Sequence, residues 1–348
     1  MQDRRHPCRL DWRRLITAQP GIAGSYADRL DTERRVYADK AEVHDLPPIF
    51  HYWTSVHLLP MLEGFGFSSP DELFIRHLEQ AYEDAPERPA RFVSLGAGNC
   101  DTEVRLCRLL LERGVSDFEF HCLDVNQEML DRGRDAARSA SLEMHLKPMR
   151  ADLNDWRPEH DYDGVVANQA LHHMISLEDL FDSVNGALPA HGRFVTSDMI
   201  GRNGHLRWPE ALTIVREFWK ELPPEYRYNL QLDRVEDEFQ DWDCSKGGFE
   251  GARAQDILPN LIERFDFELF VGFGNIIDPF IDRSFGPHFD PEKAWDRDFI
   301  YRVHEQDEAE IRAGSIKPTH MFAVMRKPPF DGMAKYRGDL TPAFCVRR

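Results

Sequence analysis

A glycine-rich turn behind a short apolar run constrains the fold of this chain more than any other feature. Residues 92–95 are mostly apolar, Gly96 and Gly98 follow at once, and a helical pattern covers residues 101–113. A buried strand that meets glycines and turns into a helix forms a binding site from its backbone. Glycine allows a ligand to approach the main chain, and the helix N-terminus presents unpaired N–H groups. A Gly-x-Gly turn alone is a weak signal, because many strand-to-helix turns contain glycines.

Polar residues at the ends of the following strands strengthen this interpretation. The apolar segment at 118–124 ends in Asp124, one strand-helix-strand unit beyond the glycines. An acid at this distance can accept hydrogen bonds from ribose hydroxyls. The next predicted strand is followed by Asp152, and the one after it ends in Asn168. In open α/β sheets, ligands bind at the carboxyl ends of the strands, so the sequence predicts a nucleotide-like ligand at this edge.

Strand and helix patterns alternate between residue 91 and about residue 199. Predicted strands lie near residues 91–96, 118–124, 144–150, 162–168 and 192–198, and predicted helices near 101–113, 126–139 and 176–188. Such alternation predicts a mostly parallel sheet with helices on its faces.

Over roughly residues 91–199 the chain resembles the class I S-adenosylmethionine-dependent methyltransferases. Gly96-Ala-Gly98 corresponds to the glycine motif of that family, Asp124 to its ribose-binding acid, and Asp152-Leu153 to the pair that contacts adenine. Leu171-His172-His173 resembles a Leu-His-His segment of many small-molecule members. The resemblance implies that S-adenosylmethionine is bound by Gly96, Ala97, Gly98, Asn99, Asp101, Asp124, Val125, Asp152, Leu153, Asn168 and Gln169.

The chain departs from the family pattern at two positions. Ser94 stands where the family has an acid in the first strand, and Cys100 replaces the third glycine of the motif. Asp101 and Glu103 are the candidates for the missing carboxylate near the methionine amino group.

The predicted fold class is α/β. It is a doubly wound, Rossmann-like, mostly parallel sheet whose last strand is antiparallel, with an N-terminal helical cap and late helical insertions. The antiparallel direction is implied by the resemblance. The predicted parts are a cap at 1–90, a cofactor-binding core at 91–200, a helical insertion or lid at 201–253, a completion of the sheet at 254–330 and a tail at 331–348.

Several elements outside the core are also predicted. Ser69-Pro-Asp-Glu72 is a helix start with a capping box, and the aromatic stretch 49–59 is expected to lie against the sheet or over the crevice. Residues 230–242 are predicted to form a helix with a solvated acidic face at 236–238. The remaining predictions are a helix at 26–42, a helix at 254–264, a strand at 265–273, an irregular segment at 278–298 and a strand at 319–325.

Histidines near the same sheet edge are candidates for proton transfer, because the pKa of imidazole lies near neutrality. His173 and His205 are the predicted catalytic residues. The preference for His173 over His172 rests on the family resemblance; packing and capping are the alternative role of the pair. The residues predicted to bind the acceptor are His172, Asp198, Arg207 and Trp208. For Asp198 the alternatives are orienting a histidine or capping the structure, and for Arg207 the alternative is a surface ion pair. No metal site is predicted, since adjacent histidines on a helix point in different directions.

The net charge of −18 argues against nonspecific binding to nucleic acid, which requires a surface rich in lysine and arginine. Six scattered cysteines with no Cys-x-x-Cys pair indicate a reducing, cytoplasmic setting. No membrane-spanning run is evident, and dimerisation through the aromatic front section is compatible with the sequence.

The sequence favours a methyltransferase that acts on an oxygen or nitrogen of a small molecule. The resemblance adds a setting in secondary metabolism. One alternative is an NAD-dependent oxidoreductase, against which the second acid at Asp152 and the missing third glycine argue. The other is a non-catalytic binding or regulatory protein of the same fold, which Ser94 and Cys100 keep open.

Overall fold

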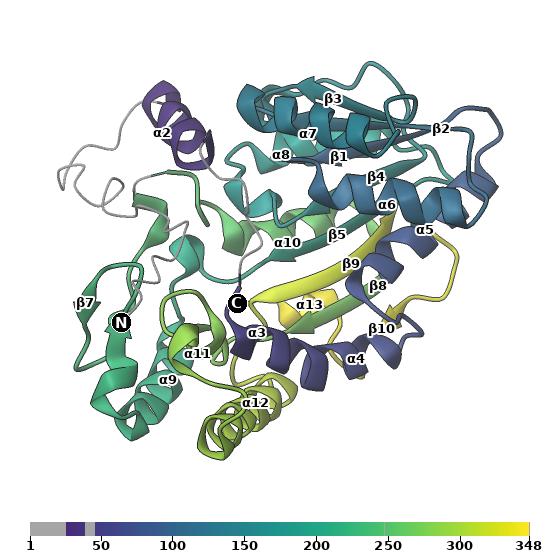
Figure 1. Cartoon of the computed structure of the whole chain (residues 1–348). Coiled ribbons are helices and arrows are strands. Elements are labelled where there is room, and N and C mark those ends of the chain that lie inside the picture. The colour runs from purple at the N-terminus through teal and green to yellow at the C-terminus, as the bar shows by residue number, and fades with distance from the viewer. Residues whose placement is uncertain (1–25, 39–45, 247, 348) are drawn as a thin grey trace.

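A sheet of eight strands organises the computed structural model, which describes residues 26–38, 46–246 and 248–347 (Figure 1). The strand order is β10-β8-β9-β5-β4-β1-β2-β3. The bounds are β1 Ala90–Leu95, β2 Phe118–Asp124, β3 Leu146–Arg150, β4 Gly164–Asn168, β5 Arg193–Met199, β8 Asp266–Phe273, β9 His320–Arg326 and β10 Lys335–Tyr336. The order reverses between β1 and β4, which is where open α/β sheets bind their ligands.

The directions of the strands agree with the predicted fold class. Strands β1 to β5 are parallel to their neighbours among themselves, whereas β9 is antiparallel to both β5 and β8. The antiparallel strand predicted at 319–325 is therefore confirmed. The short strand β10 follows it and pairs in parallel with β8.

Helices cover both faces of the sheet (Figure 1). One layer contains α5, α6 and α7, and the other contains α8, α10 and the short α13. Their apolar sides bury aromatic residues of the strands, among them Phe92, Phe120 and Phe194, which are fully buried. The bounds are α5 Pro70–Asp84, α6 Asp101–Glu112, α7 Gln127–Ser139, α8 Leu177–Ala187, α10 Ala254–Arg264 and α13 Pro342–Cys345.

Part of the N-terminal section packs on the main sheet, and part of it packs on the second half of the chain. Helix α5 packs on β4 and β5, and the Ser69 hydroxyl accepts a hydrogen bond from Glu72 N at 3.0 Å, as the predicted cap requires. The carboxylate of Glu72 pairs with arginines instead of closing the capping box. In the aromatic stretch, the Trp53 indole N–H donates to His304 Nδ1 at 3.3 Å. The other elements here are α2 Tyr26–Ala38, α3 Pro48–Trp53, the π-helix η1 Thr54–Leu58 and α4 Leu59–Glu63. The rest of the helix predicted at 26–42 lies outside the described residues.

The helix predicted at 230–242 is wrong. The segment instead forms a two-stranded hairpin of β6 Tyr228–Asn229 and β7 Arg234–Val235. The Asn229 side chain accepts hydrogen bonds from the backbone N–H groups of residues 231 and 232, so a local turn outcompetes the helix. Glu236, predicted on a solvated face, is buried and accepts from Arg234 and from the backbone N–H of Gln240.

The segment predicted to be irregular at 278–298 is more ordered than expected. It contains α11 Asp278–Ile281, the 3-10 turn η7 Gly286–His288 and the start of α12 Ala294–Ala313. Helix α12 lies beside α9 Pro209–Glu221, away from the main sheet (Figure 1). Its sequence has many charged residues and few regular apolar positions, which hides its helical period.

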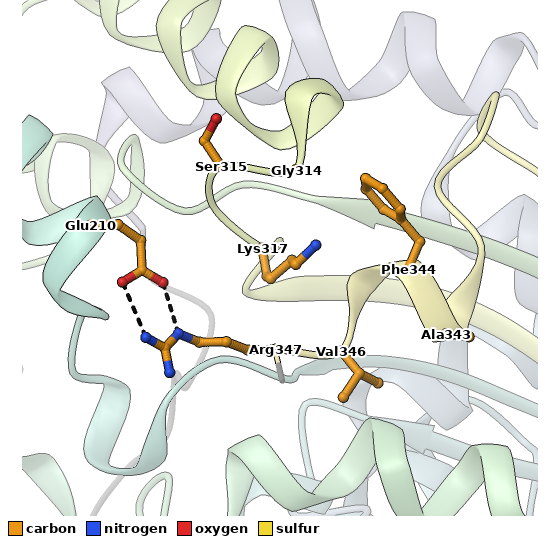
Figure 2. Close-up of a pocket in the computed structure, with 8 residues that line it drawn as sticks. All are labelled: Glu210, Gly314, Ser315, Lys317, Ala343, Phe344, Val346 and Arg347. Atoms are coloured by element: carbon orange, nitrogen blue, oxygen red, sulfur yellow. Dashed lines mark hydrogen bonds and ion pairs between the residues drawn. The ribbon is translucent and has the colours of Figure 1, made fainter.

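The C-terminal segment, predicted to be a tail, is anchored to the fold. Arg347 pairs with Glu210 of α9 at 2.8 Å, and the Lys317 ammonium lies 4.2 Å from the centre of the Phe344 ring, around a hollow of about 540 Å³ (Figure 2). Within the described part of the chain, no helix is both long enough and apolar enough to cross a membrane.

Candidate active site

A cavity of about 1170 Å³ opens at the carboxyl ends of β1, β2, β4 and β5. Ligand pockets commonly span about 300–1000 Å³, so this one has room for a cofactor and a second molecule. The predicted cofactor-binding residues all line it: Gly96, Ala97, Gly98, Asn99, Asp101, Asp124, Val125, Asp152, Leu153, Asn168 and Gln169. His172, His173, His205 and Arg207 line it too, whereas Asp198 and Trp208 do not.

The glycine turn is tied to the end of β2. The backbone N–H groups of Gly96 and Ala97 both donate to Leu123 O at 2.9 Å, and Gly98 N donates to Asp124 Oδ2 at 2.9 Å. Gly96 has φ 74°, and a Cβ there would stand 2.6 Å from the Cβ of Ala170. Glycine is required at this position by both the left-handed backbone and the close approach.

Cys100, which replaces the third glycine, keeps the left-handed turn before α6. Its φ is 59°, and its side chain is buried against Gly133 of α7. A Cβ on Gly133 would lie 2.7 Å from the Cys100 sulfur, so the glycine of one helix makes room for the cysteine of the other. The turn into α6 therefore forms without the family's third glycine.

The polar strand ends meet around the cavity as the crevice rule predicts. Asp124 Oδ1 accepts from Asn126 N at 2.8 Å, which begins α7. Asp152 accepts from the Tyr26 hydroxyl of α2 at 2.8 and 2.6 Å. Burial and Asp152 raise the pKa of Tyr26 to about 12, so its hydroxyl stays a donor. The Asn168 side chain donates to the Thr102 hydroxyl at 3.3 Å.

A buried carboxyl group compensates for the acid missing from β1. Glu103 of α6 is buried, and the Ser94 hydroxyl donates to its Oε1 at 2.7 Å. Its Oε2 is also buried and has no hydrogen-bond partner among the described residues, while the residue lines the cavity. Burial raises the pKa of Glu103 to about 7, although the Ser94 hydrogen bond opposes this shift.

Three histidines and one glutamate form a cluster in the cavity wall. His172 and His173 lie in the 3-10 turn η3 Leu171–His173 after β4, His205 ends the turn η4 Asn203–His205, and Glu250 precedes α10. The distances to Glu250 are 3.4 Å from His172 Nε2, 3.6 Å from His173 Nε2 and 2.7 Å from His205 Nε2. The rings of His172 and His173 are 4.3 Å apart between centres. The two side chains converge, contrary to the argument from helical geometry, because they lie in a tight turn.

Opposite charges dominate the electrostatics of this cluster. Burial lowers the pKa of His172, but the nearby carboxylates of Asp198 and Glu250 outweigh it and raise the pKa to about 10. Burial likewise favours the neutral form of Glu250, but His173, His172 and His205 hold its pKa well below the ordinary value. Burial lowers the pKa of His205 despite its contact with Glu250.

Asp198 was predicted to bind the acceptor, to orient a histidine or to cap the structure, and its contacts fit the last two roles. It is fully buried behind the cavity wall, and its Oδ2 accepts from the backbone N–H groups of Ala170 and Leu171 at 2.9 and 2.7 Å. Its Oδ1 bonds His172 Nδ1 at 2.7 Å. Asp198 therefore orients the turn and the ring of His172.

Trp208 was also predicted to contact the acceptor and lies elsewhere. The guanidinium carbon of Arg347 is 4.3 Å from the centre of its ring, and that of Arg202 is 5.3 Å away. Trp208 therefore stacks with both cations, beside the C-terminal segment that contains Arg347, and does not line the cavity. Arg207 does reach the cavity, but its guanidinium pairs with Asp278 Oδ2 at 3.2 Å.

The acceptor side of the cavity combines a polar corner with apolar walls. Asp278 also contacts His320 at 3.2 Å and accepts from the Thr319 hydroxyl at 2.8 Å. Burial favours protonation of Asp278, but His320 and Arg207 hold its pKa below the ordinary value. Apolar lining residues are Phe50, Trp53, Leu58, Leu230, Phe239, Phe249, Phe273, Ile281 and Phe285.

The sequence interpretation missed Glu250, Asp278 and Tyr26. Glu250 follows a glycine pair and precedes Gly251, so an acid in a glycine-bounded loop was the available signal. The sequence contains no comparable signal for Asp278 or Tyr26, because each reaches the cavity only through the packing of segments distant in sequence.

Residues 93–192 match a family model described as a methyltransferase domain. This segment contains the glycine turn, the strand-end residues and the His172–His173 turn. Together with the strand order, the match identifies the segment as a class I S-adenosylmethionine-dependent methyltransferase domain. The class of enzyme is thus a methyltransferase, and its cofactor is S-adenosylmethionine. No curated protein matches the chain.

Solved structures with a similar course of the chain include two methyltransferases. One is the O-methyltransferase from a trans-AT PKS multienzyme of Brevibacillus brevis in complex with S-adenosyl-L-homocysteine, with 12% identity, coverage of 83% of this chain and 86% of that chain, and a TM-score of 0.44. The other is geranyl diphosphate C-methyltransferase from Streptomyces coelicolor A3(2) in complex with Mg²⁺, geranyl diphosphate and S-adenosyl-L-homocysteine, with 14% identity, coverage of 88% and 100%, and a TM-score of 0.46. Similarity at this level does not extend to the substrate.

Proposed function

We propose that this protein transfers the methyl group of S-adenosylmethionine to an oxygen or nitrogen of a small molecule in a biosynthetic pathway. The observation that supports this most is the shared cavity. The glycine turn and the strand-end residues form one wall, and the cluster of His172, His173, His205 and Glu250 forms another. A methyl donor held on the first wall would face groups that accept or hold a proton on the second.

The residues on the first wall fit the cofactor. Asp124 would bind the ribose hydroxyls, and Asp152 with Leu153 would contact the adenine. Glu103 would bind the methionine amino group, which the buried, unpaired Oε2 of Glu103 supports. An ammonium group would satisfy that oxygen and favour the ionised carboxylate.

The second wall would handle the proton of the acceptor. The cofactor supplies an electrophilic methyl group, so the protein has to align the acceptor, exclude water and remove a proton where the acceptor carries one. His173 and His205 are the proposed proton acceptors, and Glu250 contacts both. The apolar walls and the corner at Asp278 favour an acceptor with a largely apolar body.

The alternatives are weaker on specific grounds. A dinucleotide site usually has a third glycine in its turn, where this chain has Cys100, and the second acid at Asp152 also argues against it. A non-catalytic role gives no reason for three histidines and a glutamate, none of them more than 20% exposed, to meet on the second wall. With a net charge of −18, nucleic acid is not the proposed acceptor.

Calorimetric titration of the protein with S-adenosylmethionine, S-adenosylhomocysteine and NAD tests the cofactor assignment. We expect binding of the first two and none of NAD. The Asp124→Ala variant should bind neither sulfur compound measurably, because the ribose hydroxyls lose their acceptor. Binding of NAD alone would replace the proposal with an oxidoreductase, and unchanged affinity in Asp124→Ala would contradict the ribose assignment.

A further inference from the structure

Two histidines and a glutamate in the cavity have the arrangement of a metal site. The donor atoms of His172, His173 and Glu250 all lie within 4.8 Å of one another. The ligands come from two segments, the turn after β4 and the loop before α10, so the fold must be formed before they meet.

The separations between donors suit a shared ion. His172 Nε2 lies 3.4 Å from Glu250 Oε1, and His173 Nε2 lies 3.6 Å from Glu250 Oε2. Both distances exceed the usual N–H···O range of about 2.7–3.2 Å. Donors bound at about 2.0–2.2 Å to one tetrahedral ion stand roughly 3.3–3.6 Å apart, which matches these two histidine–glutamate distances.

A second layer of polar groups fixes the orientation of two ligands. Asp198 Oδ1 bonds His172 Nδ1 at 2.7 Å, which leaves Nε2 to face Glu250. Metal-binding histidines usually donate their other ring N–H to a carboxylate, a backbone carbonyl or a water. Asp198 is itself held by backbone N–H groups of the same turn. His205 Nε2 bonds Glu250 Oε1 at 2.7 Å and orients that carboxylate.

We propose that His172, His173 and Glu250 bind a divalent transition-metal ion, with Asp198 and His205 as outer partners. Two imidazoles and one carboxylate suit Zn²⁺, Co²⁺ or Fe²⁺ better than Mg²⁺ or Ca²⁺, which prefer oxygen ligands. A divalent ion would also balance the carboxylate charges of Asp198, which is fully buried, and of Glu250, whose side chain is 20% exposed; both carboxylates contact His172.

The ion would have a role in the reaction, and that role rests on the proposed function. Three protein ligands leave coordination positions open toward the cavity, where an oxygen of the acceptor can bind. Coordination lowers the pKa of a bound hydroxyl, so the acceptor could be deprotonated near neutral pH. His173 would then act as a ligand, and His205 remains as the histidine beside the acceptor.

Metal binding can be measured without any methyl acceptor. Protein stripped with a chelator is titrated with Co²⁺, and visible absorption and calorimetry are recorded. We expect one equivalent to bind with the intense visible bands of a four- or five-coordinate ion, and Zn²⁺ to displace it. Glu250→Gln should weaken Co²⁺ binding by at least about 100-fold, because it removes a charged ligand but keeps the size of the side chain.

His191→Gln is the matched control. His191 also pairs with a carboxylate, Asp163, at 2.7 Å, but lies outside the cavity. Its loss should leave Co²⁺ binding unchanged. A cooperative unfolding transition would verify that the Glu250→Gln protein is folded.

Absence of a 1:1 Co²⁺ complex, or equal affinity in wild type and Glu250→Gln, overturns the metal site. Loss of binding in His191→Gln overturns it as well. The calorimetric titration with S-adenosylmethionine separates the two proposals: protein that binds the cofactor but no Co²⁺ refutes the metal site alone. Protein that binds Co²⁺ but no cofactor refutes the methyltransferase function alone.

Discussion

The two walls of the cavity are built from the chain in different ways. The cofactor wall comes mainly from one continuous stretch, residues 96–169, in which each binding residue follows a strand or begins a helix. The acceptor wall consists of His172 and His173, which directly follow that stretch, together with residues from 46–58, 201–207, 230–250, 278–288 and 319–322, which are separated by whole elements. Regular structure positions the first wall, whereas networks of buried polar contacts position the second.

This difference implies that substitutions in the two walls should have different effects. The cofactor wall is formed largely by glycines and backbone N–H groups. Replacing a single side chain there should therefore change the affinity for the cofactor more than the shape of the wall. On the acceptor wall, Glu250 and Asp278 hold several segments together, so their loss should disturb the arrangement itself. Asp198 lies at the junction, on a core strand but bonded to the histidine cluster.

Asp198→Ala should have the largest effect, because it breaks the link between the walls. It leaves His172 without its partner and removes the acceptor of the Ala170 and Leu171 N–H groups. Removing one member of a buried pair costs about 3–5 kcal/mol, so the free energy of unfolding should fall by that amount in urea denaturation.

Asp198→Asn is the control for this prediction. It keeps an oxygen that accepts from the backbone and should lose less stability than Asp198→Ala. If Asp198→Ala unfolds at the same urea concentration as wild type, the turn holds its shape without the buried carboxylate, and the comparison of the walls fails.

Glu103→Gln should have an intermediate effect that is confined to the cofactor wall. A hydrogen bond to a charged group contributes about 1.5–3 kcal/mol, so affinity for S-adenosylmethionine should fall about 10- to 100-fold. Asp101→Asn, the other candidate carboxylate, should change affinity less, because Asp101 is partly exposed. A larger loss in Asp101→Asn than in Glu103→Gln would assign the amino group to Asp101.

Glu103 should also make stability depend on pH. Burial raises its pKa from 4.5 to about 7, so between these values the folded protein keeps a proton that the unfolded chain releases. The contribution of Glu103 to stability should be fully present below pH 4.5 and fall by roughly 3 kcal/mol as the pH rises to 7. This contribution should vanish in Glu103→Gln when urea unfolding is compared across this pH range; the same slope in both proteins would contradict it.

Trp208→Leu should have the smallest effect, because Trp208 packs against Arg347 and Arg202 and does not itself line the cavity. Loss of the stacked cations should lower the free energy of unfolding by about 0.5–1 kcal/mol. Affinity for S-adenosylmethionine and the KM for an acceptor should stay within about twofold. A much higher KM for the acceptor in Trp208→Leu would instead assign Trp208 to the binding of the acceptor.

The same contrast explains what the sequence could predict. The strands, the helices of the core, the cap at Ser69 and the antiparallel strand follow from local patterns and the family resemblance, and the structure confirms them. The hairpin at 228–235 was missed because the Asn229 side chain stabilises a turn inside a segment with helical spacing. Glu250 was missed because its partners are more than 40 residues away. Spacing along the chain gives no sign of such contacts.

A crystal structure of the protein with S-adenosylhomocysteine would show whether the two walls form one methyl-transfer site. We expect the ribose to lie against Asp124, the amino group to lie against Glu103, and the sulfur to face the His172–His173–Glu250 cluster across the cavity. A ligand bound elsewhere, or a sulfur turned away from the histidines, would contradict the claim that the two walls form one methyl-transfer site.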